Sequence, residues 1–348
     1  MSFARPLRLL LLRAAESTGL NETVLSSAWR SRRLLIICWH HVSIDDEHLW
    51  DPTLCVSPAT FRSRLELLRA TRCNVMPLDE ALNGVRTGRL PQRAVALTLD
   101  DGDSSISLRA WPMLRELDLP ATLYWTTYYS LRPYAVFDPM LSYLLWKGRG
   151  RPLQLDEPAL NVRLESENER LAAFWRIYQT AKNCGWTAAT KEEFLVHLSE
   201  RLGVDYGDIR EKRILRMISP EEAARMYAEG LDLQLHTHRH RVPYDAPRPS
   251  TEIRDNMRVI EGVGARCPVH FCYPSGSYVP ELEGWLRENG VVSGATCETG
   301  LVQRRTNQYF LPRIIDQESF EPVEFKSWLS GLSSWLTRRS VMSEHGFQ

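Results

Sequence analysis

Short apolar runs alternate along the chain with segments whose apolar residues recur every three or four positions. Residues 34–39 are wholly apolar, as expected of a parallel strand that is covered on both faces, and further strands are predicted at residues 94–99, 121–125, 231–235, 269–273 and 291–296. Segments with helical spacing lie between them. One begins at Ser57-Pro58, a capping residue followed by proline at the first helical position. Strands that alternate with helices predict a parallel α/β core of the barrel type.

Residues 134–218 interrupt this alternation. Ser166 with Glu169 has the spacing of a capping box, and so has Thr190 with Glu193. Apolar residues at helical spacing follow both pairs. We therefore expect a helical insertion in the barrel, which would serve as a lid or as a wall of a substrate groove.

Amphipathic segments flank the predicted barrel, which spans residues 31–320. Residues 1–30 predict a basic amphipathic helix and a linker, and residues 321–348 predict an amphipathic helix and a tail. The apolar positions at helical spacing are Leu7, Leu10, Leu11 and Ala14 in the first, and Phe325, Trp328, Leu329, Leu332, Trp335 and Leu336 in the second. We expect the C-terminal helix to pack on the barrel. Contact of the terminal helices with a membrane surface is the alternative.

The composition limits the partners. The chain has 43 basic and 43 acidic residues, so it offers no basic field for a nucleic acid, and a neutral partner such as a sugar is favoured. Its seven cysteines show no paired spacing, which is typical of reduced thiols in the cytoplasm. The apolar run at residues 9–12 is shorter than the ~7–15 residues of a secretory signal. No run approaches the ~18 residues of a membrane span. We therefore expect a cytoplasmic protein, with peripheral membrane association as the alternative.

Residues able to do chemistry follow four of the predicted strands. They are Trp39-His40-His41, Asp100-Asp101-Gly102, His236-Thr237-His238-Arg239-His240 and Tyr273-Pro274-Ser275-Gly276. The C-terminal ends of barrel strands converge on one face, where catalytic groups lie. The four segments are therefore predicted to meet in one pocket.

Asp101, His236 and His240 together make a two-histidine, one-carboxylate set. Two imidazoles four residues apart can reach one ion if the residues between them form a turn, and such a set leaves positions open for catalysis. Asp100 would remain free as a base, and His238 is expected to point elsewhere. Each motif alone has a simpler interpretation: a helix cap, polar surface histidines or an ordinary turn.

Taken together, the motifs resemble the NodB-homology polysaccharide deacetylases, carbohydrate esterase family four. The family's Thr-Phe-Asp-Asp-Gly stands here as Thr98-Leu99-Asp100-Asp101-Gly102, and its His-Ser/Thr-x-x-His stands as the segment from His236 to His240. Its Phe-x-Tyr-Pro-x-Gly variant stands as residues 271–276, while Trp39-His40 and Leu311-Pro312-Arg313 are similar to further shared segments. The likeness spans about residues 34–316. It implies a distorted (β/α)7-type barrel.

The resemblance implies a metal-dependent hydrolase that removes acetyl from an N-acetylated sugar or polysaccharide. Asp101, His236 and His240 would bind one divalent metal, with Zn expected and Co, Ni and Mn as alternatives. Asp100 would be the general base that takes a proton from the attacking water.

The remaining roles follow the same resemblance less closely. The Tyr273 N–H is expected to hold the oxyanion, and Tyr273, Pro274 and Arg313 are expected to bind substrate, although Arg313 could instead orient Asp100. Many members supply the general acid from a late Leu-x-His motif, which this chain lacks. His40 is the substitute candidate.

Three alternatives to an N-deacetylase stay open. The same machinery attacks O-acetyl esters and N-formyl amides, so an esterase or a deformylase acting on a glycan intermediate fits the motifs. A catalytically inactive, carbohydrate-binding relative would keep the fold. The intact Asp100–Asp101 and His236–His240 set speaks against that last interpretation.

Overall fold

The computed structural model describes residues 4–242 and 248–336. In these residues, one sheet of eight parallel strands forms the centre, paired in the order β11-β10-β9-β6-β5-β1-β12, with β4 also paired to β5. The strands are β1 Leu35–Trp39, β4 Asn74–Val75, β5 Ala94–Asp101, β6 Thr122–Trp125, β9 Asp232–Leu235, β10 His270–Cys272, β11 Ser293–Ala295 and β12 Ile314–Ile315. Each segment predicted as a strand overlaps one of them.

The two edges of this sheet meet through residues 308–315. The Leu311 N–H donates to Gly294 O at 2.7 Å, and the Thr296 N–H donates to Leu311 O at 2.9 Å. A few residues later, Ile314 pairs with Ile37 of β1. One short segment therefore contacts β11 and then β1, and the predicted barrel-type fold is confirmed.

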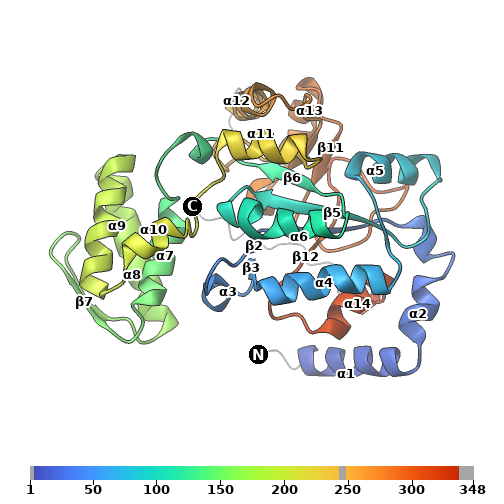
Figure 1. Ribbon diagram of the computed structural model, residues 1–348, viewed down its shortest axis with the longest axis horizontal. Helices are drawn as coiled ribbons and strands as arrows, with labels where there is room; N and C mark the ends of the chain where they lie inside the picture. Colours follow the sequence, from blue (N-terminus) through green and yellow to red (C-terminus); the bar gives the residue numbers. More distant parts are fainter. Residues whose placement is uncertain (1–3, 243–247, 337–348) are drawn as a thin grey trace.

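Helices surround the sheet (Figure 1). They are α4 Pro58–Ala70, α5 Leu78–Thr87, α6 Trp111–Glu116, α11 Pro220–Ala228, α12 Arg248–Gly262, α13 Leu282–Glu288 and α14 Pro322–Ser330. The predicted start of α4 is confirmed, since the Ser57 side chain accepts the Thr60 N–H. Near the first strand end lie β2 His41–Val42, α3 Glu47–Trp50 and β3 Cys55–Val56.

The insertion forms a lobe beside the barrel (Figure 1). It contains α7 Phe137–Lys147, β7 Pro152–Leu155, β8 Leu160–Arg163, α8 Glu167–Asn183, α9 Ala188–Leu202 and α10 Tyr206–Glu211, with a buried apolar cluster of its own. The Ser166–Glu169 capping box is confirmed. The box predicted at Thr190 is wrong, because Thr187 caps α9 by accepting the Thr190 N–H. The antiparallel pair β7–β8 was not predicted.

The C-terminal helix packs on the barrel, as expected. Phe325, Trp328 and Leu329 of α14 are buried and belong to the barrel's apolar cluster. The helix is shorter than its spacing suggests, because Gly331 ends it with a φ of 90°. Trp335 lies in a separate short helix, α15 Ser333–Leu336, and is exposed. The predicted tail after residue 336 lies outside the described residues.

The N-terminal helix α1, Ala4–Ser17, lies along α14, and α2, Leu20–Leu25, continues beside it (Figure 1). Arg5 and Arg8 of α1 both pair with Glu324, so the basic side of α1 faces the barrel. The exposed side carries the leucines of the predicted stripe, Leu7, Leu10 and Leu11. Membrane contact by this stripe stays a prediction.

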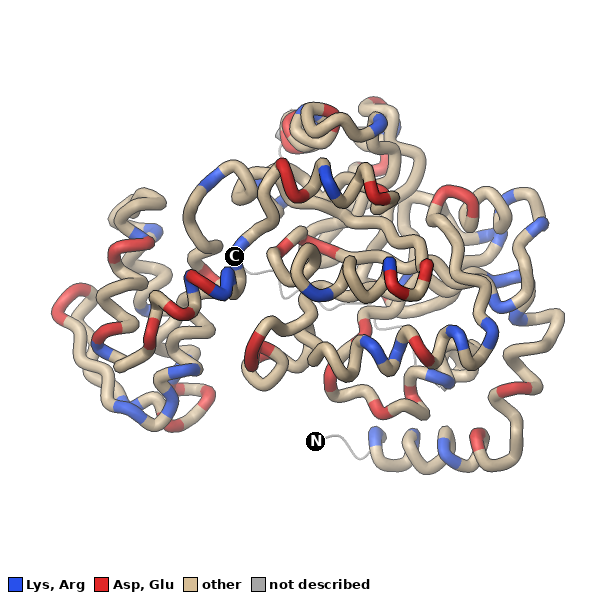
Figure 2. Tube along the Cα trace, viewed as in Figure 1, with Lys and Arg blue, Asp and Glu red and all other residues tan. Residues whose placement is uncertain are grey.

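The described helices include no membrane span, and charged residues of both signs are mixed along the chain. In the described part of the chain, every helix is too short or too polar to traverse a bilayer. Figure 2 shows basic and acidic residues interspersed over the barrel helices and the insertion. The predicted cellular location and the predicted absence of a nucleic-acid partner stay predictions.

Candidate metal centre

Asp101, His236 and His240 lie together at the C-terminal ends of β5 and β9. The Nε2 atoms of His236 and His240 lie 3.1 Å and 3.0 Å from the same oxygen, Oδ1 of Asp101. One donor atom from each of the three residues falls within 4.8 Å of the others. The residues predicted as metal ligands thus present their donor atoms to one point.

Unusual backbone angles aim these side chains. Asp101 and His240 have φ values of 68° and 53°, in the left-handed region that is uncommon for residues with a side chain. Gly102 follows with a φ of 92°, and a Cβ there would lie 2.4 Å from Cδ1 of Trp125. Only glycine fits this turn, which directs Asp101 out of the strand.

Buried hydrogen bonds fix the orientation of His236. Its Nδ1–H donates to the Cys272 carbonyl at 2.9 Å, and its backbone N–H donates to Oδ1 of Asn256 at 2.9 Å. The Nε2 lone pair therefore points at Asp101. His238 lies apart, as expected, with its Nδ1 2.8 Å from the Thr127 hydroxyl.

The donor set fits a divalent cation. A lone pair of His236 and the carboxylate of Asp101 repel each other unless positive charge lies between them. Burial alone would lower the pKa of His240, but the adjacent Asp101 outweighs it and raises that pKa. Burial would likewise raise the pKa of Asp101, yet the charge of His240 and its hydrogen bond hold it well below its usual range. Imidazole nitrogens with one carboxylate oxygen are ligands that Zn²⁺ and related ions accept.

Asp100 lies beside this cluster but in a different environment. Its carboxylate is 1% exposed, and one oxygen lies within 4.8 Å of a ring nitrogen of His236. Arg313 donates to both of its oxygens, and the Cys272 thiol donates to Oδ2 at 3.4 Å. Burial would raise the pKa of Asp100, but the charge of Arg313 outweighs it, so the carboxyl stays ionised.

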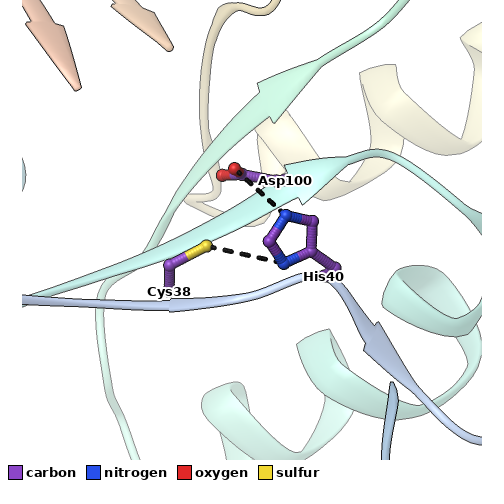
Figure 3. A group of neighbouring side chains, drawn as sticks. All are labelled: Cys38, His40 and Asp100. Carbon is purple, nitrogen blue, oxygen red and sulfur yellow. Dashed lines mark hydrogen bonds and ion pairs between the residues drawn. The ribbon is translucent and has the colours of Figure 1, made fainter. Parts of the chain in front are cut away.

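His40 lies between Asp100 and Cys38 (Figure 3). Its Nε2 is 3.7 Å from Oδ2 of Asp100, and its Nδ1 is 4.0 Å from the Cys38 sulfur. The imidazole is 15% exposed, whereas Cys38 is fully buried and burial raises the pKa of its thiol. His40 is thus a partly accessible proton carrier next to the carboxylate of Asp100.

The predicted oxyanion role of the Tyr273 N–H needs correction. The Tyr273 N–H already donates to Ala295 O at 3.0 Å, because the pairing of β10 with β11 continues to this residue, so it is not free to hold an oxyanion. The side chains of Tyr273, Pro274 and Arg313 are all buried in this structure, and their predicted contact with a substrate stays a prediction. Arg313 orients Asp100, the second of its two predicted roles.

Sequence reasoning did not identify several residues that shape the site. In the sequence, Cys38 and Cys272 are only two of seven unpaired cysteines, yet Cys272 contacts both Asp100 and Arg313. Asn256 of α12 donates to Trp125 O and to the Thr127 hydroxyl, and it accepts from His236, so it ties three elements together. A polar residue inside the apolar stripe of a helix was the available signal for Asn256.

His41 forms a second buried charge cluster below the site. Its Nδ1 is 2.9 Å from Asp103 and its Nε2 is 3.2 Å from Glu47. Burial lowers the pKa of His41, but the two carboxylates outweigh it and raise the pKa to about 10. A charged imidazolium therefore connects α3 to the turn after Asp101.

Fold and site together define a barrel of parallel strands with a two-histidine, one-carboxylate cluster at its strand ends. A family model described as "Polysaccharide deacetylase" matches residues 167–293, which include His236 and His240 but not Asp101. The chain is also 33% identical over 67 residues to poly-beta-1,6-N-acetyl-D-glucosamine N-deacetylase of Staphylococcus aureus. That match covers 19% of this chain and 23% of the relative.

Solved structures share the fold. A Streptococcus pyogenes deacetylase, PplD in complex with acetate, superposes with a TM-score of 0.55 at 16% identity, over 84% of this chain and 96% of that one. A polysaccharide deacetylase from Bacillus cereus superposes with a TM-score of 0.52 at 13% identity, over 85% of this chain and 69% of that one. IcaB from Ammonifex degensii superposes with a TM-score of 0.50 at 17% identity, over 89% of this chain and 99% of that one. The chain thus shares its fold with these deacetylases, and its residues 167–293 match the polysaccharide deacetylase family model.

Proposed function

We propose that this protein is a metal-dependent carbohydrate N-deacetylase, which hydrolyses an N-acetyl amide on a sugar to acetate and a free amine. The observation that carries the proposal is the convergence of His236 and His240 on Oδ1 of Asp101, with the ionised Asp100 alongside. The match of residues 167–293 to the polysaccharide deacetylase family model supports it.

Asp101, His236 and His240 would hold the ion. A divalent ion bound there would supply Lewis-acid polarisation of the acetyl carbonyl and of the attacking water. The tight orientation of His236 by Cys272 O, and of Asp101 by the Gly102 turn, would keep the donor atoms in place without reorganisation.

Asp100 would act as the general base. Arg313 keeps it ionised and in one orientation, so it can accept a proton from water as the oxygen attacks the acetyl carbon. Its low pKa makes it a weak base in the resting protein. Proton transfer to it would therefore depend on a water made more acidic at the site.

His40 would act as the general acid. When the carbon–nitrogen bond breaks, the amine nitrogen needs a proton, and a protonated His40 can supply it. Its distance of 3.7 Å from Asp100 would let the proton taken by the base return through the same pair of side chains. No oxyanion donor is assigned, because the Tyr273 N–H is engaged in the sheet.

The test is acetate release from defined sugars. The purified protein should release acetate from oligomers of β-1,6-linked or β-1,4-linked N-acetylglucosamine when Zn²⁺ or Co²⁺ is present, and chelation with EDTA should abolish the release reversibly. Asp101→Asn is the matched control, since it should lose both bound metal and activity. The proposal fails if no acetate forms with Zn, Co, Ni or Mn on either series of oligomers.

A further inference from the structure

A cavity of about 550 Å³ lies between the insertion and the loop that carries the candidate metal ligands. Arg239, the residue before His240, lines it from the barrel side, and Tyr178, Trp186 and Lys191 line it from α8, α9 and the turn between them. Its volume lies within the range of about 300–1,000 Å³ that is typical of small-molecule sites. The cavity is therefore lined by Arg239 and Arg241, the two neighbours of His240 in the chain, and is completed by the insertion.

The lining is rich in aromatic rings. Tyr128, Tyr129, Tyr134 and Tyr178 contribute, together with Trp186. The apolar face of a pyranose ring packs well on such rings, while the tyrosine hydroxyls can pair with sugar hydroxyls. The Tyr128 N–H donates to His238 O at 2.7 Å, so this aromatic wall is tied directly to the ligand loop.

Two of the lining cations lack a counter-ion. Within the described residues, neither Arg132 nor Lys191 has a carboxylate within 4.0 Å. Instead, the Arg132 guanidinium lies 4.2 Å from the centre of the Tyr128 ring, and Lys191 Nζ lies 5.1 Å from that of Phe137. Both charges are held by aromatic contacts and remain available for an anion.

The lining acids do not cancel this charge. Glu192 is engaged by the Tyr206 hydroxyl at 3.2 Å and by Arg210 at 3.9 Å. Burial raises the pKa of Asp138 and outweighs the charge of Lys191, which acts in the opposite direction. The cavity thus combines sugar-stacking surfaces with an excess of positive charge.

We propose that this cavity binds an anionic sugar unit, one that carries a carboxylate or a phosphate, next to the sugar that is presented to the metal centre. The insertion then selects an acidic glycan as the substrate class. The link to deacetylation rests on the proposed function, whereas the binding of the anionic unit does not.

The experiment measures binding to the full-length protein in EDTA, so that no turnover occurs. The carboxylate probe is a tetrasaccharide of alternating glucuronic acid and N-acetylglucosamine, and the neutral probe is chitotetraose. N-acetylglucosamine 6-phosphate against N-acetylglucosamine forms the phosphate arm. We expect at least one anionic probe to bind tenfold or more tightly than its neutral counterpart at low salt, and this preference to shrink as NaCl is raised.

Charge-removing variants assign the preference to the cavity. The double variant Arg132→Gln/Lys191→Gln should bind the anionic probe no more tightly than the neutral one. Arg176→Gln, on the exposed side of α8 and outside the lining, is the matched control and should behave as the wild type. Equal affinity for anionic and neutral probes in the wild type overturns the proposal, and this comparison needs no variant to fold. An unchanged preference in the double variant overturns it as well.

The outcome is separable from that of the proposed function. A protein that prefers the acidic tetrasaccharide in EDTA but releases no acetate with any metal keeps the cavity assignment and loses the deacetylase. A protein that releases acetate but binds both tetrasaccharides equally keeps the deacetylase and loses the cavity assignment.

Discussion

Arg313 donates hydrogen bonds to both carboxylate oxygens of Asp100, from Nη1 to Oδ1 at 2.8 Å and from Nη2 to Oδ2 at 2.5 Å. Both side chains are buried, and 213 positions separate them in the sequence. Because a buried charge without a partner is costly, each residue depends on the other. The pair connects the candidate base on β5 to the segment that closes the barrel.

Removal of Arg313 should destabilise the protein. In Arg313→Met the buried carboxylate of Asp100 loses its partner, which costs about 3–5 kcal/mol in comparable cases. Urea unfolding should therefore show a lower midpoint, and the double variant Asp100→Asn/Arg313→Met should lose less than the sum of the two single variants. A change below about 1 kcal/mol, the range of an exposed ion pair, would contradict the structural role of this contact.

Asp100→Asn should separate metal binding from turnover. The amide can still accept from Arg313 but cannot take a proton from water, so the rate of acetate release should fall about 10²–10⁴-fold. The metal content, measured after dialysis against Zn²⁺, should equal that of the wild type, whereas Asp101→Asn should lose the metal. A variant that keeps most of the rate would exclude Asp100 as the base.

The strands and the candidate site could be predicted because both leave strong local signals. A parallel strand covered on both faces is a continuous apolar run, and the groups after such runs must meet at one end of a barrel. This reasoning located Asp101, His236 and His240 before any geometry was known. It missed β4, Asn74–Val75, and β12, Ile314–Ile315, since a strand of two residues shows no periodicity.

Roles that depend on hydrogen-bond partners could not be predicted. The Tyr273 N–H is engaged because β11 pairs one residue beyond the end of β10, and no pattern in the sequence marks where pairing stops. Arg313 could bind substrate or Asp100, and its hydrogen bonds to Asp100 appear only in the folded structure. The choice between Thr187 and Thr190 as the cap of α9 likewise depends on three-dimensional contacts, because both are good capping residues.

His240 and His238 form a matched pair for testing the metal centre. His240→Ala removes a donor atom 3.0 Å from Asp101 and should weaken Zn²⁺ binding by at least about 100-fold. His238→Ala removes a hydrogen bond to Thr127 instead, and should cost about 1 kcal/mol of stability with the metal retained. Isothermal titration with Zn²⁺ and urea unfolding measure the two effects. Equal loss of metal in both variants would contradict the assignment of His240.

His40→Gln should slow the reaction in a way that depends on the leaving group. An amine needs a proton to leave, so deacetylation of an N-acetyl sugar should fall about 10²–10⁴-fold. The p-nitrophenolate of p-nitrophenyl acetate leaves without a proton, so its hydrolysis should be much less affected. An equal loss of hydrolysis rate on both substrates would show that His40 is not the general acid.

The buried His41 should make stability depend on pH in a predictable direction. Its pKa is about 10 in the folded protein, because Asp103 and Glu47 outweigh the effect of burial, and about 6.5 when unfolded. A raised pKa means that the stabilisation is fully present below about pH 6.5 and is lost as pH rises toward 10. At pH 6 we therefore expect His41→Gln to lower the free energy of unfolding by a few kcal/mol, which is the order of magnitude that this pKa shift implies. Urea unfolding at pH 6 and pH 9.5 measures the difference between wild type and variant, which should be clearly smaller at the higher pH. An equal difference in the free energy of unfolding at both pH values would mean that His41 is not held as a cation between its two carboxylates.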